Sequence, residues 1–223
     1  MKRIGHWIID YVYLLRGGTH SFIYHRPPKH YLGHIVEGKY PIILIPGLMG
    51  KWNNLAKIAN RISLLGHPVY IVPKLGMNTA DIPTSSKIVR EVIDQNNLDN
   101  TLLLAYSKGG LIGKYLLAHF NKDKRVKKLI SIATPYHGVG PVKYIPIKHY
   151  KELATSSEII TDLSQHNEVN DKIVSIYPIF DNHIWPQSSA HLEGATNIRV
   201  DVSGHHKVLY SKEVEKKILE QVE

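Results

Sequence analysis

Cysteine is absent from the sequence, and this absence excludes several kinds of site. Without cysteine the chain has no disulfide, no thiol nucleophile and no thiolate ligand for a metal ion. The sequence also lacks any uninterrupted apolar stretch of the ~18 residues that a membrane span needs. Helix-turn-helix, zinc-finger and ribonucleoprotein motifs are missing as well, so no nucleic-acid partner is expected.

Acidic residues are fewer than basic ones, with 19 Asp and Glu against 28 Lys and Arg, which gives a net charge of +9. This surplus favours anionic partners such as an acidic lipid surface. The alternative is an enzyme whose basic surface serves no partner. Hydrophobic residues make up 43% and charged residues 21%, which is ordinary for a globular protein. The length of 223 residues suits one domain, and no pattern specifies an oligomeric state.

The first 39 residues differ in composition from the rest, so we expect an N-terminal helix and irregular arm at 1–39 and a main domain at 40–223. Apolar residues at positions 4, 7, 8, 11, 12 and 15 share one helical face. Asp10 interrupts this stretch and no cleavage site follows, so we expect no signal peptide and a cytoplasmic protein. The helix is expected to pack on the domain. Alternatively, it lies on an anionic membrane as a peripheral contact.

From residue 40 onward, short apolar runs alternate with amphipathic stretches. The runs lie at 41–46, 69–72, 101–105, 128–132, 173–177 and 197–202. Apolar runs without alternation are typical of strands that are covered on both faces. Stretches with helical spacing lie at 52–65, 88–93, 111–120 and 214–222. These patterns predict a single α/β domain with a mostly parallel sheet of about six strands and helices on both faces.

A serine directly follows the third apolar run, within the sequence YSKGG at 106–110. A serine between a strand and a helix is the context of a nucleophile elbow, a turn that is too sharp for large side chains two positions before and after it. Ala105 and Gly109 meet this requirement. The start of the helix also favours developing negative charge. We therefore predict that Ser107 is a nucleophile.

A serine nucleophile needs a base, and the base needs an acid to orient it; in this fold the chain order is serine, acid, histidine. Asp181 follows the fifth apolar run and His205 follows the sixth. We predict these two residues as acid and base. Asp162 is a poorer acid because it lies in a predicted helix, and Asp201 because it lies within a predicted strand.

His205 has a neighbouring histidine, His206, after the same run. Adjacent residues of an extended loop point in opposite directions, so only one of the two reaches Ser107. Gly204 allows the backbone to turn directly before His205. We therefore assign the base to His205.

Backbone N–H groups are expected to stabilise the oxyanion, because they need no reorganisation as it forms. One is the amide of Lys108, next to the nucleophile, and the other is the amide of Leu48, in the turn PGLMG at 46–50. Met49, Tyr106 and His137 are the candidates to line the pocket. Neither H-E-x-x-H nor a similar spacing occurs among the 14 histidines, so we expect no metal ion and no cofactor.

Five stretches of the chain resemble the small bacterial lipases and esterases of the α/β-hydrolase superfamily and, more loosely, lipase-like relatives of GPI inositol-deacylases. They read PIILIPGLMG, LLLAYSKGGLIGKYL, ISIATPYHGVG, VSIYPIFDNHIWPQSSAHLEGATNI and SGHHKVLYSKEV. The resemblance implies hydrolysis of small-molecule or lipid carboxylic esters by the triad Ser107, Asp181 and His205, with Leu48 and Lys108 as oxyanion donors. Lys108 departs from the family in replacing an apolar residue, which places a cation beside the site.

Two other functions stay open at this point. An acyltransferase or thioesterase would use the same triad, and a catalytically silent protein could bind a lipid or a partner on the same fold. The segment at 138–172 is too short for an independent cap domain, so we expect at most a small flap over the acyl groove.

Overall fold

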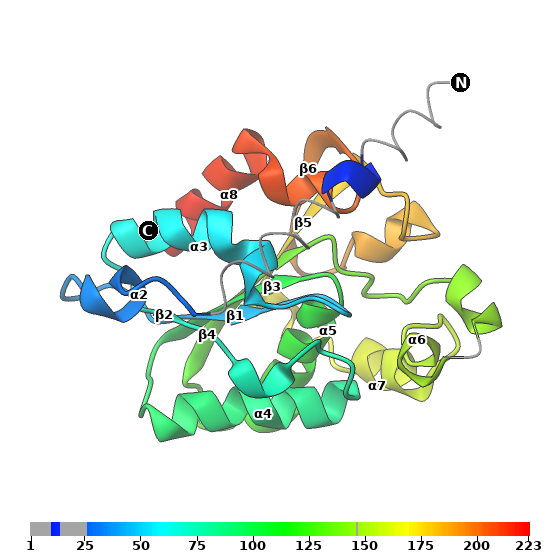
Figure 1. Cartoon of the computed structure of the whole chain (residues 1–223). Helices are drawn as coiled ribbons and strands as arrows, with labels where there is room; N and C mark the ends of the chain where they lie inside the picture. Colours follow the sequence, from blue (N-terminus) through cyan, green and yellow to red (C-terminus); the bar gives the residue numbers. More distant parts are fainter. Residues whose placement is uncertain (1–9, 14–25, 146) are drawn as a thin grey trace.

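The computed structural model of the chain describes residues 10–13, 26–145 and 147–223 (Figure 1). Most of the helix predicted at 4–15 lies outside the described residues, and of this stretch the structure describes a helical turn at 10–13. Within the described ranges, no helix is both long and apolar enough to cross a membrane.

The core of the fold is one parallel sheet of six strands in the order β2-β1-β3-β4-β5-β6. All six apolar runs form strands, which confirms the predicted fold class. The strands are β1 (Ile42–Ile45), β2 (Val69–Tyr70), β3 (Thr101–Tyr106), β4 (Val126–Ile132), β5 (Ile173–Phe180) and β6 (Thr196–Ser203).

Helices cover both faces of this sheet, with α3 and α8 on one face and α4 and α5 on the other (Figure 1). The α-helices are α2 (His30–Gly33), α3 (Ala56–Leu64), α4 (Ile82–Gln95), α5 (Lys108–Tyr115), α6 (Lys148–Lys151), α7 (Glu158–Gln165) and α8 (Lys212–Val222). The shorter elements are the 3-10 helices η1 (Trp52–Leu55), η2 (Pro73–Leu75), η4 (Pro141–Tyr144), η5 (Asn170–Lys172), η6 (Gln187–Ala190) and η7 (Lys207–Tyr210) and the π-helix η3 (Leu116–Phe120).

Side chains of the central strands alternate between two apolar clusters, because successive residues of a strand point to opposite faces. Ile43 and Leu103 pack in the cluster beneath α4 and α5, whereas Ile42 and Leu104 pack in the cluster beneath α3 and α8. All four side chains are fully buried. The continuous apolar sequence of these strands therefore follows from their position between two layers of helices.

The described part of the N-terminal arm packs on the main domain. Tyr31 in α2 is buried within the cluster beneath α3 and α8, and its ring meets Trp52 edge-on at 6.0 Å. The backbone N–H of Val36 donates to the carbonyl of Gly66 at 3.0 Å. Asp10 is completely buried. The arm thus contributes buried residues to the same core as the predicted main domain.

Candidate active site

Ser107 lies in the turn between β3 and α5, at the carboxyl edge of the sheet. Its backbone has φ 53° and ψ −121°, a conformation that residues other than glycine rarely adopt and that occurs often at functional sites. The turn leaves no space around the following glycines. A Cβ at Gly109 would meet the carbonyl oxygens of Ile45 and Pro46, and a Cβ at Gly110 would meet the side chain of Thr134.

Ser107, His205 and Asp181 form one continuous hydrogen-bonded chain. His205 Nε2 lies 3.1 Å from Ser107 Oγ, and His205 Nδ1 lies 2.7 Å from Asp181 Oδ2. A carboxylate at this place keeps the proton on Nδ1, so Nε2 has the free lone pair that can accept the Ser107 proton. His205 is 5% exposed and Asp181 3% exposed, so little water competes for these bonds. The three residues predicted from three strand ends therefore meet in space.

The Asp181 carboxylate is held by its own loop. Its Oδ1 accepts the N–H groups of His183 at 2.8 Å and Ile184 at 3.0 Å. Gln187 clamps the backbone of the same loop by accepting from the Asp181 N–H and donating to the Asp181 carbonyl, both at 2.6 Å. Burial raises the pKa of the Asp181 carboxyl, but the charge and hydrogen bond of His205 and the two N–H donors outweigh burial and lower it below 3.8. Asp181 is therefore ionised at neutral pH.

The loop that carries His205 is held by side chains that the sequence did not single out. Asn182 Oδ1 accepts the N–H of His205 at 2.9 Å. Asp10 Oδ1 accepts the next two N–H groups, from His206 at 2.8 Å and Lys207 at 2.9 Å. The sequence interpretation treats Asp10 only as an interruption of an apolar stretch. Only its complete burial, which is a property of the fold, indicates its part in this loop.

A cavity of about 370 Å³ opens beside Ser107 and His205. This volume lies within the range of small-molecule sites. Most of the remaining lining is apolar and comes from the turn after β1, the segment 138–172 and the loop after β5; it includes Leu48, Met49, Val139, Val142, Leu153 and Ile184. Met49 and Tyr106 line the cavity as predicted. The segment 138–172 thus forms a wall of the cavity through η4 and the residues around α6.

His137 does not take the position that the sequence interpretation gives it. Its ring is exposed, and Nε2 lies 3.1 Å from the carbonyl oxygen of His191, away from the cavity lining. The backbone N–H of His137 also turns toward Ser189, at 3.2 Å from its Oγ. The structure therefore does not bring His137 to the cavity, because these contacts turn the residue toward the loop after β5.

Two backbone amides lie close to Ser107. Lys108 is the first residue of α5, and N–H groups of a first helical turn have no partner within the helix. Leu48 lines the same cavity as Ser107, in the turn after β1. A Cβ at Gly47, the residue before Leu48, would lie 3.2 Å from Ser107 Cβ, so this turn passes directly beside the serine.

The Lys108 ammonium does not face the cavity, although the sequence predicts a cation beside the site. The side chain is fully buried, pairs with the carboxylate of Glu152 and donates to the carbonyl of Ala80 at 2.5 Å. Glu152 also accepts the N–H of Ile82, the first residue of α4, at 3.0 Å. Lys108 therefore connects the segment 138–172 to α4, and its charge is balanced by Glu152.

Among the described residues, two groups of histidine and aspartate side chains are close enough to share a metal ion. Asp10, His183 and His206 form one group next to His205, and His119, Asp162 and His166 form the other on the surface beside α7. In the second group, His119 Nε2 is already paired with Asp162 Oδ2 at 2.9 Å.

Comparison with known proteins places the chain in a family. A family model described as alpha/beta hydrolase fold matches residues 40–163, which is 124 of the 223 residues. The matched range includes Ser107, Lys108 and Leu48.

Solved structures of other proteins share the fold. Lipase BlEst2 from Bacillus licheniformis, in its mature form, has a TM-score of 0.65 at 16% identity, and the match covers 86% of this chain and 95% of that chain. The product of the gene lin2722 from Listeria innocua has a TM-score of 0.60 at 17% identity, with 81% and 92% covered. A monoacylglycerol lipase from Paleococcus ferrophilus has a TM-score of 0.59 at 11% identity, with 82% and 95% covered.

Proposed function

The chain belongs to the alpha/beta-hydrolase fold family, and from this premise we propose that it hydrolyses carboxylic esters with Ser107 as the nucleophile. The observation that carries the proposal is the chain of hydrogen bonds from Ser107 Oγ through His205 to the buried Asp181 carboxylate, at 3.1 and 2.7 Å. A buried histidine between a carboxylate and a serine hydroxyl is the arrangement that activates a serine for acyl transfer.

In the proposed reaction, His205 Nε2 removes the Ser107 proton while Ser107 Oγ attacks the ester carbonyl carbon. The Asp181 carboxylate stabilises the imidazolium that forms. The amides of Leu48 and Lys108 donate to the oxyanion of the tetrahedral intermediate. His205 then returns the proton to the leaving alcohol, which yields the acyl-enzyme. Water, activated by the same imidazole, releases the acid and restores the serine.

The cavity beside Ser107 supports an ester with an apolar acyl part. Leu48, Met49, Val139, Val142 and Leu153 surround it, and its volume is about 370 Å³. An acyl chain gains free energy by leaving water for this lining. The likeness in fold to proteins named as lipases supports the same substrate class, a small-molecule or lipid ester. The Lys108 charge is paired with Glu152 and adds no preference for an anionic substrate.

Ser107→Ala tests the proposal. The hydroxyl is the nucleophile, so its loss is expected to lower kcat/KM for p-nitrophenyl esters on the order of 10³-fold or more without loss of fold. Ser164→Ala is the matched control, because Ser164 is an exposed serine on α7 that lies outside the cavity lining. Circular dichroism checks folding, and a fluorophosphonate probe is expected to label the wild type and Ser164→Ala but not Ser107→Ala.

Full activity or labelling in folded Ser107→Ala would refute the assignment. The same assay separates the two alternative functions. Addition of an alcohol or thiol acceptor, with analysis of the products, distinguishes acyl transfer from hydrolysis. A wild-type protein that neither turns over esters of increasing chain length nor reacts with the probe would be a binding protein on this fold.

A further inference from the structure

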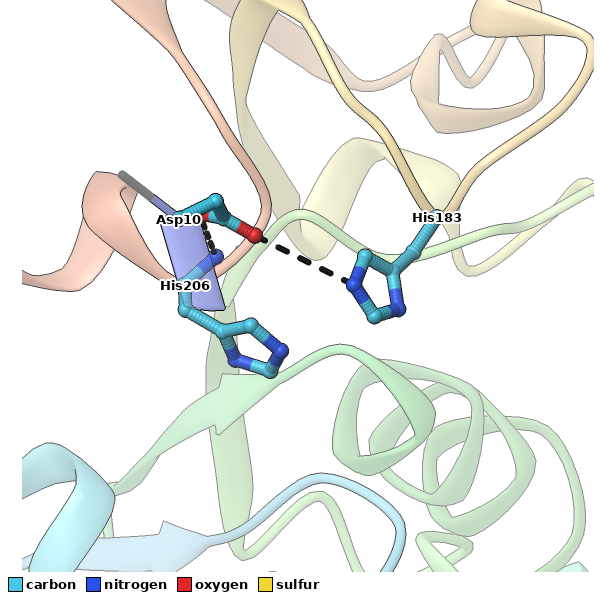
Figure 2. A group of neighbouring side chains, drawn as sticks. All are labelled: Asp10, His183 and His206. Atoms are coloured by element: carbon cyan, nitrogen blue, oxygen red, sulfur yellow. Dashed lines mark hydrogen bonds and ion pairs between the residues drawn. The ribbon is translucent and has the colours of Figure 1, made fainter. Parts of the chain in front are cut away.

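Next to the base, three buried ligand-type atoms converge that have no hydrogen-bond partner among the described residues. Asp10 is completely buried, and its Oδ1 accepts two backbone N–H groups while its Oδ2 has no partner among the described residues. His183 Nε2 and His206 Nε2 are likewise buried atoms for which the described chain offers no hydrogen bond. Figure 2 shows the three side chains, with the His183 ring directed at the Asp10 carboxylate, and the three ligand atoms all lie within 4.8 Å of one another.

Within the described part of the chain, Asp10 Oδ2 lacks a hydrogen-bond donor. A carboxylate away from water needs hydrogen bonds or a cation for each oxygen, because desolvation otherwise costs several kcal/mol. His183 Nε2, at 3.9 Å from Asp10 Oδ2, is too far for a hydrogen bond.

The ring of His206 is oriented so that Nε2 carries a lone pair. The Tyr106 hydroxyl donates its single proton to the carbonyl oxygen of His205 at 3.1 Å. Its oxygen lies 3.0 Å from His206 Nδ1 and is left to accept the proton of that nitrogen. A histidine that donates from one ring nitrogen in this way presents the other as a ligand, which is how outer residues orient metal-binding histidines.

We propose that Asp10, His183 and His206 form a binding site for a divalent transition-metal ion of the Zn²⁺ type. Two neutral imidazoles and one carboxylate are a common donor set for such ions, and water would complete the coordination. Ligand bonds of about 2.0–2.1 Å place tetrahedral ligands about 3.3 Å apart. The separation of 3.9 Å between Asp10 Oδ2 and His183 Nε2 is therefore larger by about half an ångström, which side-chain rotation can close.

The ion would join three segments next to the candidate active site. His183 lies two residues after Asp181, and its ring stacks on that of His205 with centroids 4.9 Å apart and planes at 20°. His206 directly follows His205, and Asp10 comes from the N-terminal arm. The site would therefore fix the acid loop and the histidine loop to the arm. None of its ligands is Ser107, His205 or Asp181, but His183 and His206 also line the cavity beside Ser107.

Zinc binding by the untagged, chelator-treated full chain tests the proposal, with Zn²⁺ alone as the probe. Asp10→Asn retains an oxygen for the two backbone N–H groups but replaces Oδ2 by a neutral amide nitrogen. Asp162→Asn is the matched control in the half-buried group with His119 and His166. Calorimetry is expected to show one saturable site in the wild type and in Asp162→Asn, with affinity lowered on the order of 100-fold or more in Asp10→Asn.

Thermal unfolding gives a second readout. Zn²⁺ at about 100 times its dissociation constant is expected to raise the Tm of the wild type by about 5–10 °C, and not that of Asp10→Asn. If Asp10→Asn does not fold, His183→Ala serves instead, because the His183 side chain is 35% exposed, although its ring contacts with His205 and His206 are lost. The proposal is overturned if the wild type shows no saturable binding at millimolar Zn²⁺, or if binding survives both Asp10→Asn and His183→Ala, or if Asp162→Asn abolishes it.

Discussion

Gly109, two residues after Ser107, has no room for a side chain. A side chain at this position is therefore expected to displace Ser107 and to lower the rate of the reaction. A Cβ at this position would lie 2.8 Å from the carbonyl oxygen of Pro46 and closer still to that of Ile45. Real Cβ atoms essentially never approach within 3.0 Å of such atoms. Both oxygens belong to the backbone at the end of β1, so they cannot rotate away. Gly109→Ala must therefore move α5 away from the turn that holds Leu48.

The magnitude follows from that displacement. Relief of these contacts requires a shift on the order of 0.5–1 Å between Ser107 and the Leu48 amide, and a misplacement of ~1 Å costs on the order of 10²-fold in rate. Overpacking costs about 1–3 kcal/mol of stability, partly offset by the better helix propensity of alanine. We therefore expect Gly109→Ala to remain folded and to lose about 10²-fold in kcat/KM.

Gly113→Ala is the matched control, one turn later in α5. Its Cβ would lie 2.6 Å from Leu129 Cδ1 and 3.0 Å from Cδ2. These atoms end a side chain that can rotate, and they lie below the helix, away from Ser107. The variant is expected to lose a similar amount of stability in urea unfolding but to keep kcat/KM for the same p-nitrophenyl ester within about threefold of the wild type. The reasoning fails if folded Gly109→Ala is as active as the wild type, or if Gly113→Ala is equally impaired.

Two further changes separate closely related residues. His205→Ala is expected to lower kcat on the order of 10³-fold or more, because the base is lost. His206→Ala removes a ring that contacts Tyr106 and is expected to lower kcat less than about tenfold. Assays of both variants with one short ester test this, and the reverse order would reassign the base. Burial lowers the pKa of Lys114 to about 8, although the charge of Glu168 opposes this shift. Between pH 8 and 10.5 the folded state therefore binds fewer protons than the unfolded chain, so the free energy of unfolding rises with pH in this range. Lys114→Met is expected to be more stable by about 1–3 kcal/mol at pH 7 and to lack that rise in urea unfolding at pH 7 and 9; a less stable variant at pH 7 would contradict the argument.

The positions of the central strands can be predicted from the sequence because β1 and β3 are buried between helices on both faces. Their ends are harder to predict. β4 begins at Val126, two residues before the apolar run. The strand can include two lysines because Lys127 is exposed and the Lys128 ammonium donates to the carbonyl of Gln221, so neither charge is buried without a partner. β5 continues past Pro178 to Phe180 although proline cannot donate to a ladder, and its register with β6 shifts there.

The meeting of Ser107, Asp181 and His205 can be anticipated because each follows the end of a strand in one parallel sheet, where such ends lie along one edge. The residues that hold their loops give no comparable signal. Asn182 and Gln187 act through hydrogen bonds to backbone atoms, and these depend on the path of the loop rather than on any spacing. The turn around His137 resembles the family in sequence, but this resemblance does not determine the direction of the His137 side chain, which lies against the carbonyl oxygen of His191.

Asp10 is the residue whose role lies furthest beyond sequence interpretation, since its partners are His206 and Lys207, almost 200 positions away. A Cβ at Gly204 would lie 2.5 Å from Asp10 Oδ1, so the glycine that allows the turn before His205 also makes room for this carboxylate. Hydrogen bonds to charged groups contribute about 1.5–3 kcal/mol each. Two of them act on the loop that positions the base. Asp10, which belongs to the predicted arm at 1–39, therefore helps to hold a loop of the predicted domain at 40–223 that carries a candidate catalytic residue.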